Sequence, residues 1–271
     1  MSSKQWIEHA LSSGTDSKAW ELFHENSKLG RYSPVRSEQE IRDWLSRLHD
    51  SLPFVGYPVT ALPKSLPDLK TPLTKAILSR TSIREFVHHS LTLKELATLL
   101  HYAYGVSRNI AASHFVRPLR VAPSAGGLYP LEIFFHSCDV KKLSPGLYHY
   151  NPSKGQLRHI REGDHRPQLT QSFLQDSIPR QASVLVFITA LFERSVYKYA
   201  DRGYRYALLE AGHVAQNMTL IASALRLGCV SIGGFVDREI DEFLQLDGIA
   251  HSTIYVLAIG KENHEHRRQK K

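Results

Sequence analysis

The segment YRYALLEAGHVAQNMTLIASALRLG, Tyr204–Gly228, is where the fold of this 271-residue chain can first be predicted. Its apolar residues recur at helical spacing, which predicts one long helix over residues 203–227. Arg226 lies in the last predicted turn, and glycine, here Gly228, commonly follows a helix end. Within the helix, the pair Ala211–Gly212 is small. A glycine there costs about 1 kcal/mol and usually has a steric reason, so we expect another element to pack closely.

Both helical and strand-like patterns surround this segment. The stretch TLKELATLLHYAYG begins with a capping box of Thr92 and Glu95, and DREIDEFLQL has the pattern of another helix. Four stretches have the apolar character of strands: LEIFFHSC, GLYHYNPSKGQLRHI, SVLVFITA and STIYVLAIG. Because the two kinds of element intermix, the sequence predicts a layered α+β fold.

Three regions can be distinguished. Residues 1–70 are expected to form a helical N-terminal extension, with a capping box of Ser37 and Glu40, that ends in the proline-rich connector LPFVGYPVTALPKSLPDLKTP. Residues 71–261 form the main domain. Residues 262–271 include the basic stretch HEHRRQKK, which lacks apolar periodicity and is predicted to be a disordered tail. The sequence does not indicate what the extension does.

Composition narrows the class of protein. The formal net charge is +8, but much of the excess lies in the tail, so it is weak support for a nucleic-acid partner. No stretch is long and apolar enough to span a membrane, and no signal peptide is evident. Cys138 and Cys229 are the only cysteines, which favours a reduced, cytoplasmic location. No set of histidines, cysteines or carboxylates has metal-ligand spacing, so no metal is expected.

The first motif with chemical potential is RTSIREF, residues 80–86. In an extended chain Arg80, Ser82 and Arg84 would project from the same side. Two guanidinium groups and a hydroxyl suit a phosphate group. A solvated strand edge is the alternative interpretation of this triplet.

Two glycine-containing loops and one lysine follow. The loop APSAGGLYP precedes a strand, and its backbone N–H groups could approach a planar or anionic ligand. It matches neither the dinucleotide fingerprint nor the phosphate-binding P-loop, and an ordinary turn is the alternative. The loop SIGGF contains Gly233 and Gly234, and Lys261 follows the last predicted strand. Separately, a plain turn and a solvated lysine would explain these residues.

Taken in order, these motifs and the long helix resemble the FMN-dependent nitroreductase superfamily, and more closely its SagB/McbC-type azoline dehydrogenases. The resemblance spans roughly residues 71–261, and FHENSKL in the extension is also similar to that branch. It implies a homodimer with a central mixed or antiparallel sheet, flanking helices and a long central helix. The small pair Ala211–Gly212 would then allow the close helix approach that a dimer core needs. The resemblance also implies FMN-binding residues: Arg80, Ser82, Arg84 and Lys261 at the phosphate and ribityl end, Pro123, Ser124, Gly126 and Gly127 against the isoalloxazine across the dimer interface, and Gly233 and Gly234 near flavin N5.

The resemblance gives Lys198 and Tyr199 a catalytic role, because azoline dehydrogenases of this type carry a Lys-Tyr pair here. Tyrosine is a poor base near neutrality unless a cation favours its phenolate form. Our hypothesis is that Tyr199 is the general base and that Lys198 tunes it or positions the substrate. Arg202 and Arg205 are alternative cations without an assigned role. Without the resemblance, Lys198 and Tyr199 would be interpreted as residues at a helix edge.

One histidine remains a minor candidate. His213 lies inside the long helix, and the preferred interpretation is a histidine of the core. It stays a candidate catalyst because the matching family helix also tends to carry histidine there.

The implied reaction converts thiazolines or oxazolines of a ribosomally made precursor peptide into thiazoles or oxazoles, with the reduced flavin reoxidised by oxygen. Implied partners are a cyclodehydratase and a peptide-recognition protein. Two alternatives stay open: an NAD(P)H-dependent nitroreductase or quinone reductase, and a flavin-free scaffold subunit. Nucleic-acid binding is not expected, because the basic and aromatic residues 198–206 adjoin a core helix and match no recognised module.

Overall fold

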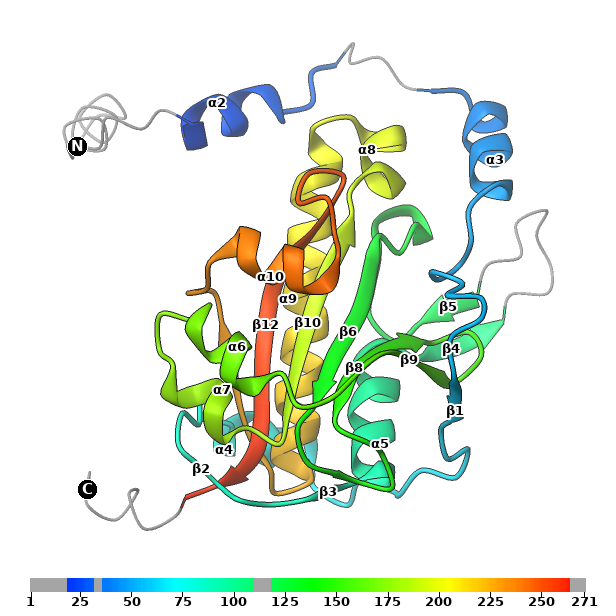
Figure 1. Cartoon of the computed structure of the whole chain (residues 1–271). Coiled ribbons are helices and arrows are strands. Elements are labelled where there is room, and N and C mark those ends of the chain that lie inside the picture. Colours follow the sequence, from blue (N-terminus) through cyan, green and yellow to red (C-terminus); the bar gives the residue numbers. More distant parts are fainter. Residues whose placement is uncertain (1–18, 32–35, 110–117, 264–271) are drawn as a thin grey trace.

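The computed structural model describes residues 19–31, 36–109 and 118–263 (Figure 1). Residues 1–18 of the predicted extension and residues 264–271 of the predicted tail lie outside the described residues.

An antiparallel sheet forms the centre of the domain. Its strands are ordered β1-β9-β8-β6-β10-β12-β11, and β2 pairs with the end of β12. The strands are β1 Val59–Ala61, β2 Phe86–Val87, β6 Leu131–Ser137, β8 Gly146–Asn151, β9 Gln156–Glu162, β10 Val184–Leu191, β11 Gly228–Ile232 and β12 His251–Glu262. Two small pairs lie outside this sheet: β3 Leu91–Thr92 with β7 Val140–Lys141, and β4 Val106–Asn109 with β5 Pro118–Arg120. The last strand, β12, ends at Glu262, one residue beyond the predicted domain of residues 71–261.

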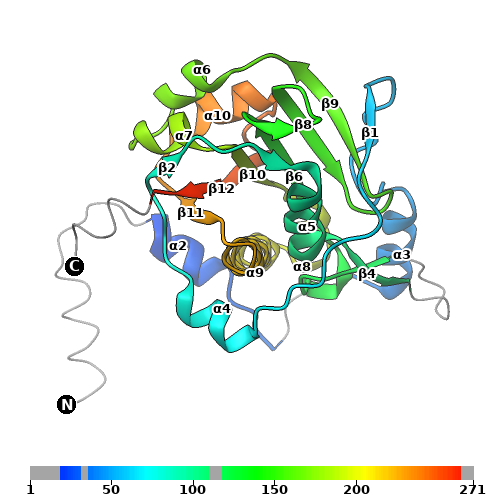
Figure 2. The ribbon, with the colours of Figure 1, turned by 90° about the horizontal axis from the view of Figure 1, so that it is seen from below.

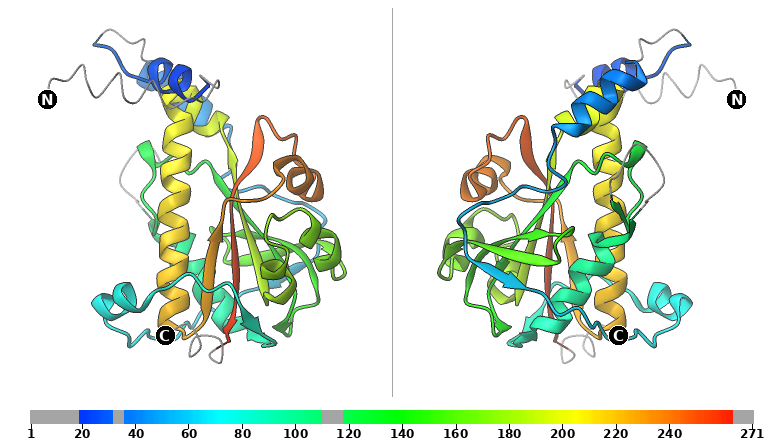
Figure 3. Two further views of the ribbon diagram at one scale, coloured as in Figure 1. Left: turned by 90° about the vertical axis from the view of Figure 1, so that its left-hand side faces the viewer. Right: turned by 90° about the vertical axis from the view of Figure 1, so that its right-hand side faces the viewer.

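Helices cover both faces of the sheet, as Figures 2 and 3 show. One face packs against α5 and α9, and the other packs against α6, α7 and α10. The helices are α2 Ala19–Asn26, α3 Glu38–Ser46, α4 Leu73–Ser79, α5 Leu93–Tyr104, α6 Arg166–Gln171, α7 Ser177–Gln181, α8 Glu193–Tyr199, α9 Arg202–Ala224 and α10 Asp237–Leu244. The predicted α+β fold with a long central helix is confirmed.

Strand alternation explains the two layers. Along β10, Val184, Val186 and Ile188 belong to the cluster that contains α9. Leu185 and Phe187, which point the other way, belong to the cluster that contains α10. Continuous burial of this strand follows from having helices on both faces.

The end of α9 differs from the sequence prediction in a specific way. The residue with left-handed backbone is Arg226, with φ of 58°, and Leu227 N–H donates to the carbonyl of Ala222. This pattern is a Schellman end without glycine. Gly228 instead begins β11, where an added Cβ would lie 2.8 Å from the Ile83 side chain. Gly228 therefore makes room for the Ile83 side chain, and it is not the residue that ends the helix.

The start of α9 separates the sequence 195–206 into two helices. Ala200, with φ of 46°, ends α8 immediately after Tyr199, and α9 begins at Arg202. Gly203 lies against the backbone of α8, because a Cβ there would be 2.6 Å from the Ser195 carbonyl carbon. Lys198 and Tyr199 are consequently held at the end of a short helix packed on the central one.

Candidate functional site

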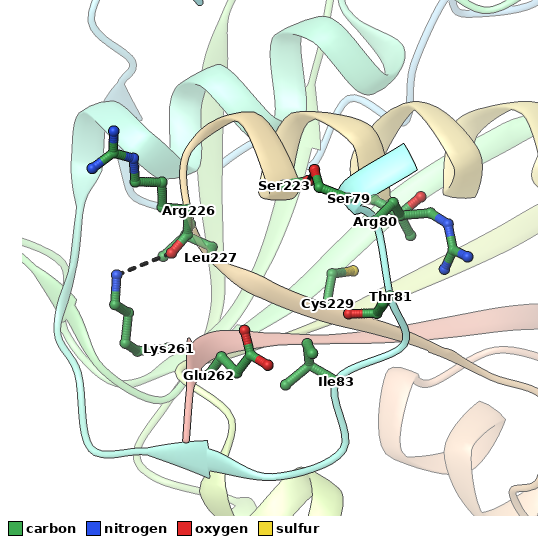
Figure 4. A pocket seen from close by; sticks show the side chains of 11 residues that line it. Ser79, Arg80, Thr81, Ile83, Ser223, Arg226, Leu227, Cys229, Lys261 and Glu262 are labelled. Atoms are coloured by element: carbon green, nitrogen blue, oxygen red, sulfur yellow. Dashed lines mark hydrogen bonds between the residues drawn. The ribbon is translucent and has the colours of Figure 1, made fainter. Parts of the chain in front are cut away.

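A cavity of about 420 Å³ lies beside the C-terminal end of α9. It is lined by Ser79, Arg80, Thr81, Ile83, Thr219, Ser223, Arg226, Leu227, Cys229, Lys261 and Glu262. The cavity therefore brings together the end of α4, the end of α9, β11 and β12, and it contains two of the predicted phosphate ligands, Arg80 and Lys261 (Figure 4).

The polar groups of this cavity suit an anion with hydroxyl groups. Lys261 Nζ donates to the Arg226 carbonyl at 3.0 Å, and the hydroxyls of Ser79 and Ser223 are 3.1 Å apart. Figure 4 shows the guanidinium groups of Arg80 and Arg226 at opposite sides of the cavity. Burial raises the pKa of Cys229 to about 12, so its thiol is protonated at neutral pH and offers no nucleophile.

Ser82 and Arg84 are not among the lining residues of this cavity. Ser82 forms an isolated bridge with Cys229, and Arg84 donates to the Ser82 carbonyl at 3.4 Å. The segment leaves α4 at Arg80 with extended backbone and contains no regular strand before β2 begins at Phe86. Sequence reasoning missed Arg226 and Ser223, which come from the end of the long helix.

The loop 122–130 lies at the other end of α9. It contains a single 3-10 turn, Ala125–Gly127, in which Gly126 and Gly127 have φ of 63° and 64°. Ser124 Oγ accepts from the backbone N–H of Tyr129 at 2.9 Å, which closes the loop. Pro123 precedes the turn and is exposed. The two glycines are therefore required by backbone conformation at this position.

Gly126 is in close contact with the predicted catalytic pair. A Cβ at residue 126 would lie 2.5 Å from Tyr199 Oη and 3.0 Å from Lys198 Nζ. Lys198 Nζ is 5.2 Å from the centre of the Tyr199 ring, and the two side chains are half-buried. The fold thus unites the glycine loop and the Lys-Tyr pair, which the sequence separates by about 70 residues.

The N-terminal extension supports α8 from outside. The ring of Trp44 stacks on Tyr197 with centroids 4.4 Å apart. Arg36 donates to the Tyr197 carbonyl at 2.8 Å and lies over its ring. Ile41 and Leu45 of α3 form a small core with Leu128 of the glycine loop, against which Tyr199 packs. Residues 36–48 are therefore part of the structure that holds the Lys-Tyr pair.

A buried ion pair fixes the start of α8. Arg194 lies 2.8 Å from Glu132 at the start of β6, and both side chains are almost fully buried. Arg194 also donates to the carbonyls of Tyr129 and His49, at 3.2 and 3.3 Å. Although burial opposes ionisation, Arg194 and a hydrogen bond from His149 hold the pKa of Glu132 well below its usual range. The ion pair and these two hydrogen bonds link the segment after α3, the glycine loop and α8.

The remaining candidates lie elsewhere. Gly233 and Gly234 form the turn between β11 and α10, where Gly234 accepts from the Leu174 N–H and Gly233 faces open space. Arg205 binds α2 through the His24 carbonyl and the Phe23 ring. His213 was expected in the core, but it is exposed on the outer face of α9.

That outer face of α9 is partly apolar. Its exposed large residues are Tyr204, Leu208 and Leu209, and the helix beside it, α4, exposes Leu73, Ile77 and Leu78. Ala211 is buried in the core that α9 shares with α5, whereas an added Cβ at Gly212 would meet no atom within 4 Å in the described chain.

The two halves of the candidate site lie far apart in one chain. Tyr199 packs against Tyr206 near the start of α9, whereas the cavity adjoins Ser223 near its end. At 1.5 Å per residue these positions are about 25 Å apart along the helix. Among the residues that the structure describes, no group of three or more histidines, cysteines or carboxylates could hold a metal, and no helix is long and apolar enough to cross a membrane.

The fold and the sequence place the chain among nitroreductases. The model of the nitroreductase family matches residues 77–261, and the chain belongs to that family. MJ1384 of Methanocaldococcus jannaschii, a nitroreductase-like protein, is 38% identical over 182 residues, which are 67% of this chain and 88% of MJ1384. The microcin B17-processing protein McbC of Escherichia coli is 28% identical over 155 residues, 53% of this chain and 55% of McbC.

Solved structures show the same fold. A nitroreductase-like protein from Anabaena variabilis has a TM-score of 0.69 and 26% identity over 89% of this chain, which spans 47% of the Anabaena protein. The E. coli microcin synthetase McbBCD complex with truncated pro-MccB17 bound contains a chain with a TM-score of 0.56 and 20% identity, over 90% of this chain and 92% of that one. The family establishes an oxidoreductase of the flavoprotein class.

Proposed function

We propose that the protein is an FMN-dependent dehydrogenase that converts azolines of a ribosomally made peptide to azoles. The observation that carries the proposal is the contact of Gly126 with Tyr199 and Lys198. It joins the loop and the Lys-Tyr pair, the two features on which the resemblance to azoline dehydrogenases rests. The likeness to McbC, whose name describes it as a microcin-processing protein, supports the same substrate class.

The donor set of the cavity fits FMN. Arg80, Arg226 and Lys261 outnumber the one lining carboxylate, Glu262, so the cavity is positively charged. Ser79 and Ser223 add hydroxyl groups, and this lining suits a phosphate and a ribityl chain. Members of the nitroreductase family bind FMN. When bound, FMN would supply the acceptor for the hydride that leaves the azoline ring.

The chain would contribute the base. Aromatisation removes a hydride from one ring carbon and a proton from its neighbour, and the phenolate form of Tyr199 would accept that proton. Lys198 Nζ lies 5.2 Å from the centre of the Tyr199 ring, and its role would be to assist Tyr199 or to position the substrate. Among the residues that the structure describes, neither side chain is engaged in an ion pair or a side-chain hydrogen bond, so both are available to a substrate.

The site would require two copies of the chain. Lys198 and Tyr199 lie about 25 Å along α9 from the cavity, and the exposed apolar face of α9 offers a surface for a second copy. A two-fold axis beside α9 would bring the loop of one subunit towards the cavity of the other. We therefore propose a homodimer in which each active site combines Arg80 of one subunit with Tyr199 of its partner.

Mixed dimers test both parts of this proposal. Arg80→Ala and Tyr199→Phe homodimers should each lose azoline oxidation, whereas Tyr199→Phe should retain FMN. After subunit exchange, a mixed dimer has one site with both residues intact, so the mixture should recover about a quarter of wild-type activity. If mixing restores nothing, the two-subunit site is wrong. If Tyr199→Phe turns over normally, Tyr199 is not the base.

An NAD(P)H-dependent nitroreductase or quinone reductase is the second candidate, and the likeness to MJ1384 favours it. Rapid bleaching of the flavin by NAD(P)H, without any azoline requirement, would establish this candidate. A scaffold subunit without catalysis would instead give a colourless protein that cannot be reconstituted with FMN. The McbBCD complex supports the further proposal that the chain assembles with a cyclodehydratase and a peptide-recognition protein.

A further inference from the structure

Tyr129, near the end of the glycine loop, has a backbone conformation that is uncommon for a residue with a side chain. Its φ is 48°, in the left-handed region. Such a residue persists where its surroundings fix it. Within the loop, the Tyr129 N–H donates to Ser124 Oγ at 2.9 Å. From outside the loop, the Arg120 N–H donates to the Tyr129 hydroxyl at 2.9 Å, and the Arg194 side chain donates to the Tyr129 carbonyl at 3.2 Å.

Arg194 is the partner of Tyr129 that belongs to α8. Its guanidinium group therefore joins the end of the glycine loop to the helix that carries Lys198 and Tyr199. Because α8 has only seven residues, its first turn and its last residue, Tyr199, are held as one unit. The Tyr199 ring packs against the small core that contains Leu128, the neighbour of Tyr129. The loop and α8 are thus joined by a hydrogen bond at one point and by packing at another.

Glu132 fixes the Arg194 side chain in turn. Its Oε1 lies 2.8 Å from Arg194 and accepts from the Leu52 N–H at 3.1 Å. Its Oε2 accepts from the Ser51 hydroxyl at 2.9 Å and from His149 Nε2 at 2.7 Å. Each carboxylate oxygen therefore has two donors, which is its full capacity. With four donors around it, the carboxylate is held in one orientation, and it holds Arg194 there too.

Stability alone is a poor explanation for this ion pair. Both side chains are buried, and replacing a buried ion pair by apolar residues of similar volume often leaves stability unchanged or raises it. The guanidinium group, however, is a rigid planar fork. One of its terminal nitrogens serves Glu132 and Tyr129, and the other donates to the His49 carbonyl at 3.3 Å. What the pair adds over an apolar one is a fixed geometry among three segments of the chain.

We propose that Arg194 and Glu132 are positioning residues for azoline oxidation. Held by Glu132, the Arg194 guanidinium fixes the end of the glycine loop relative to α8 and so keeps Tyr199 against Gly126. This inference rests on the proposed function and adds to it two residues outside the predicted site.

Arg194→Lys tests the proposal in the FMN-loaded dimer. The variant keeps a positive charge beside Glu132 but loses the fork that also reaches Tyr129 and His49. We expect kcat per bound FMN to fall about 100-fold, because a displacement of about 1 Å can cost that much. The KM for the azoline peptide should change less than about threefold, since the lost interaction serves the chemical step. A kcat close to that of the wild type would overturn the inference.

Arg161→Lys is the matched control. Arg161 is also partly buried and also donates to a backbone carbonyl, that of Phe243, and it lies over the Phe243 ring at 4.3 Å. These contacts are with α10, on the face of the sheet opposite α9. Arg161→Lys should therefore lower the denaturant midpoint without lowering kcat. An equal loss of kcat in the two lysine variants would assign the effect to stability and overturn the inference.

A double variant separates positioning from stability. Glu132→Gln alone leaves Arg194 buried without a counter-charge and can fail to fold. Glu132→Gln combined with Arg194→Met has no buried charge at this place, and the glutamine amide can still bond to Leu52 and Ser51. The double variant should resist denaturant better than Glu132→Gln, while its kcat per bound FMN stays about 100-fold below that of the wild type. Recovery of kcat together with stability would show that the pair is only structural.

A spectroscopic readout keeps this inference distinct from the proposed function. A fluorotyrosine in place of Tyr199 reports the surroundings of that ring by fluorine NMR without any turnover. Its resonance should shift or broaden in Arg194→Lys and stay unchanged in Arg161→Lys. If no variant and no wild-type protein oxidises an azoline, the proposed function fails, and the resonance still tests the positioning of Tyr199. A resonance that Arg194→Lys leaves unchanged would overturn the inference, whatever the rate.

Discussion

Replacing Gly126 by alanine tests the contact between the glycine loop and the Lys-Tyr pair. The added Cβ would lie 2.5 Å from Tyr199 Oη, and non-bonded atoms prefer about 3.5 Å. The hydroxyl must therefore move by about 1 Å, and a displacement of that size can cost about 100-fold in rate. The Tyr199 hydroxyl is at the end of a side chain and can move, so the effect should be on catalysis more than on folding.

Gly127→Ala is the matched control. Gly127 has nearly the same φ, 64° against 63°, but its Cβ would meet no atom within 4 Å. Both variants place alanine in the left-handed region, which costs about 1–2 kcal/mol of stability. The difference between them therefore isolates the contact with Tyr199.

The assay is azoline turnover measured by mass spectrometry, together with FMN content and denaturant unfolding. Because the resemblance assigns both glycines to the flavin, kcat is expressed per bound FMN. On that basis we expect Gly126→Ala to lose about 100-fold and Gly127→Ala less than about threefold, with similar losses of unfolding free energy in both. Equal kcat values for the two variants would refute the contact as a determinant of catalysis.

Three further results are expected. Equilibrium dialysis should show weaker FMN binding in Arg80→Ala, because the variant loses a charge-assisted contact worth about 1.5–3 kcal/mol. Arg84 lies outside the cavity, so Arg84→Ala should retain more FMN than Arg80→Ala. Weaker binding in Arg84→Ala than in Arg80→Ala would mean that the phosphate binds elsewhere. Trp44→Ala removes the stack on Tyr197 and should lower kcat with little loss of FMN. Trp20 is 58% exposed, so Trp20→Ala should leave kcat unchanged. Equal kcat values in the two variants would show that the N-terminal extension does not support catalysis. Burial lowers the pKa of His251 to about 4. As the pH drops from 6.5 towards 4, the unfolded chain binds the proton before the folded one does, so the unfolding free energy should fall. A His251→Asn variant whose unfolding free energy, from denaturant titrations, changes equally with pH would contradict this.

Local patterns predicted the elements well. Both capping boxes, Ser37 with Glu40 and Thr92 with Glu95, form as the sequence indicates, because they depend on residues three positions apart. The long helix is confirmed, but the reason for Gly228 is not local. It makes room for Ile83, more than 140 residues earlier in the chain, which no helix-end rule can anticipate.

The site could be predicted only in part for the same reason. The resemblance supplied the cavity residues Arg80 and Lys261, which the structure brings to one cavity. The sequence could not reveal that Glu210 of α9 is buried beside the Tyr104 hydroxyl, because nothing distinguishes it from a surface glutamate until α5 and α9 pack together. The support of α8 by Trp44 likewise depends on contacts across about 150 residues.

The measurement closest to the central claim is incubation of the purified protein with an azoline-containing peptide in air, followed by mass spectrometry. The proposed function predicts that each azoline ring loses two hydrogens, that FMN is present, and that Tyr199→Phe with full FMN abolishes the loss. An unchanged peptide mass, with a flavin that NAD(P)H bleaches rapidly, would contradict it.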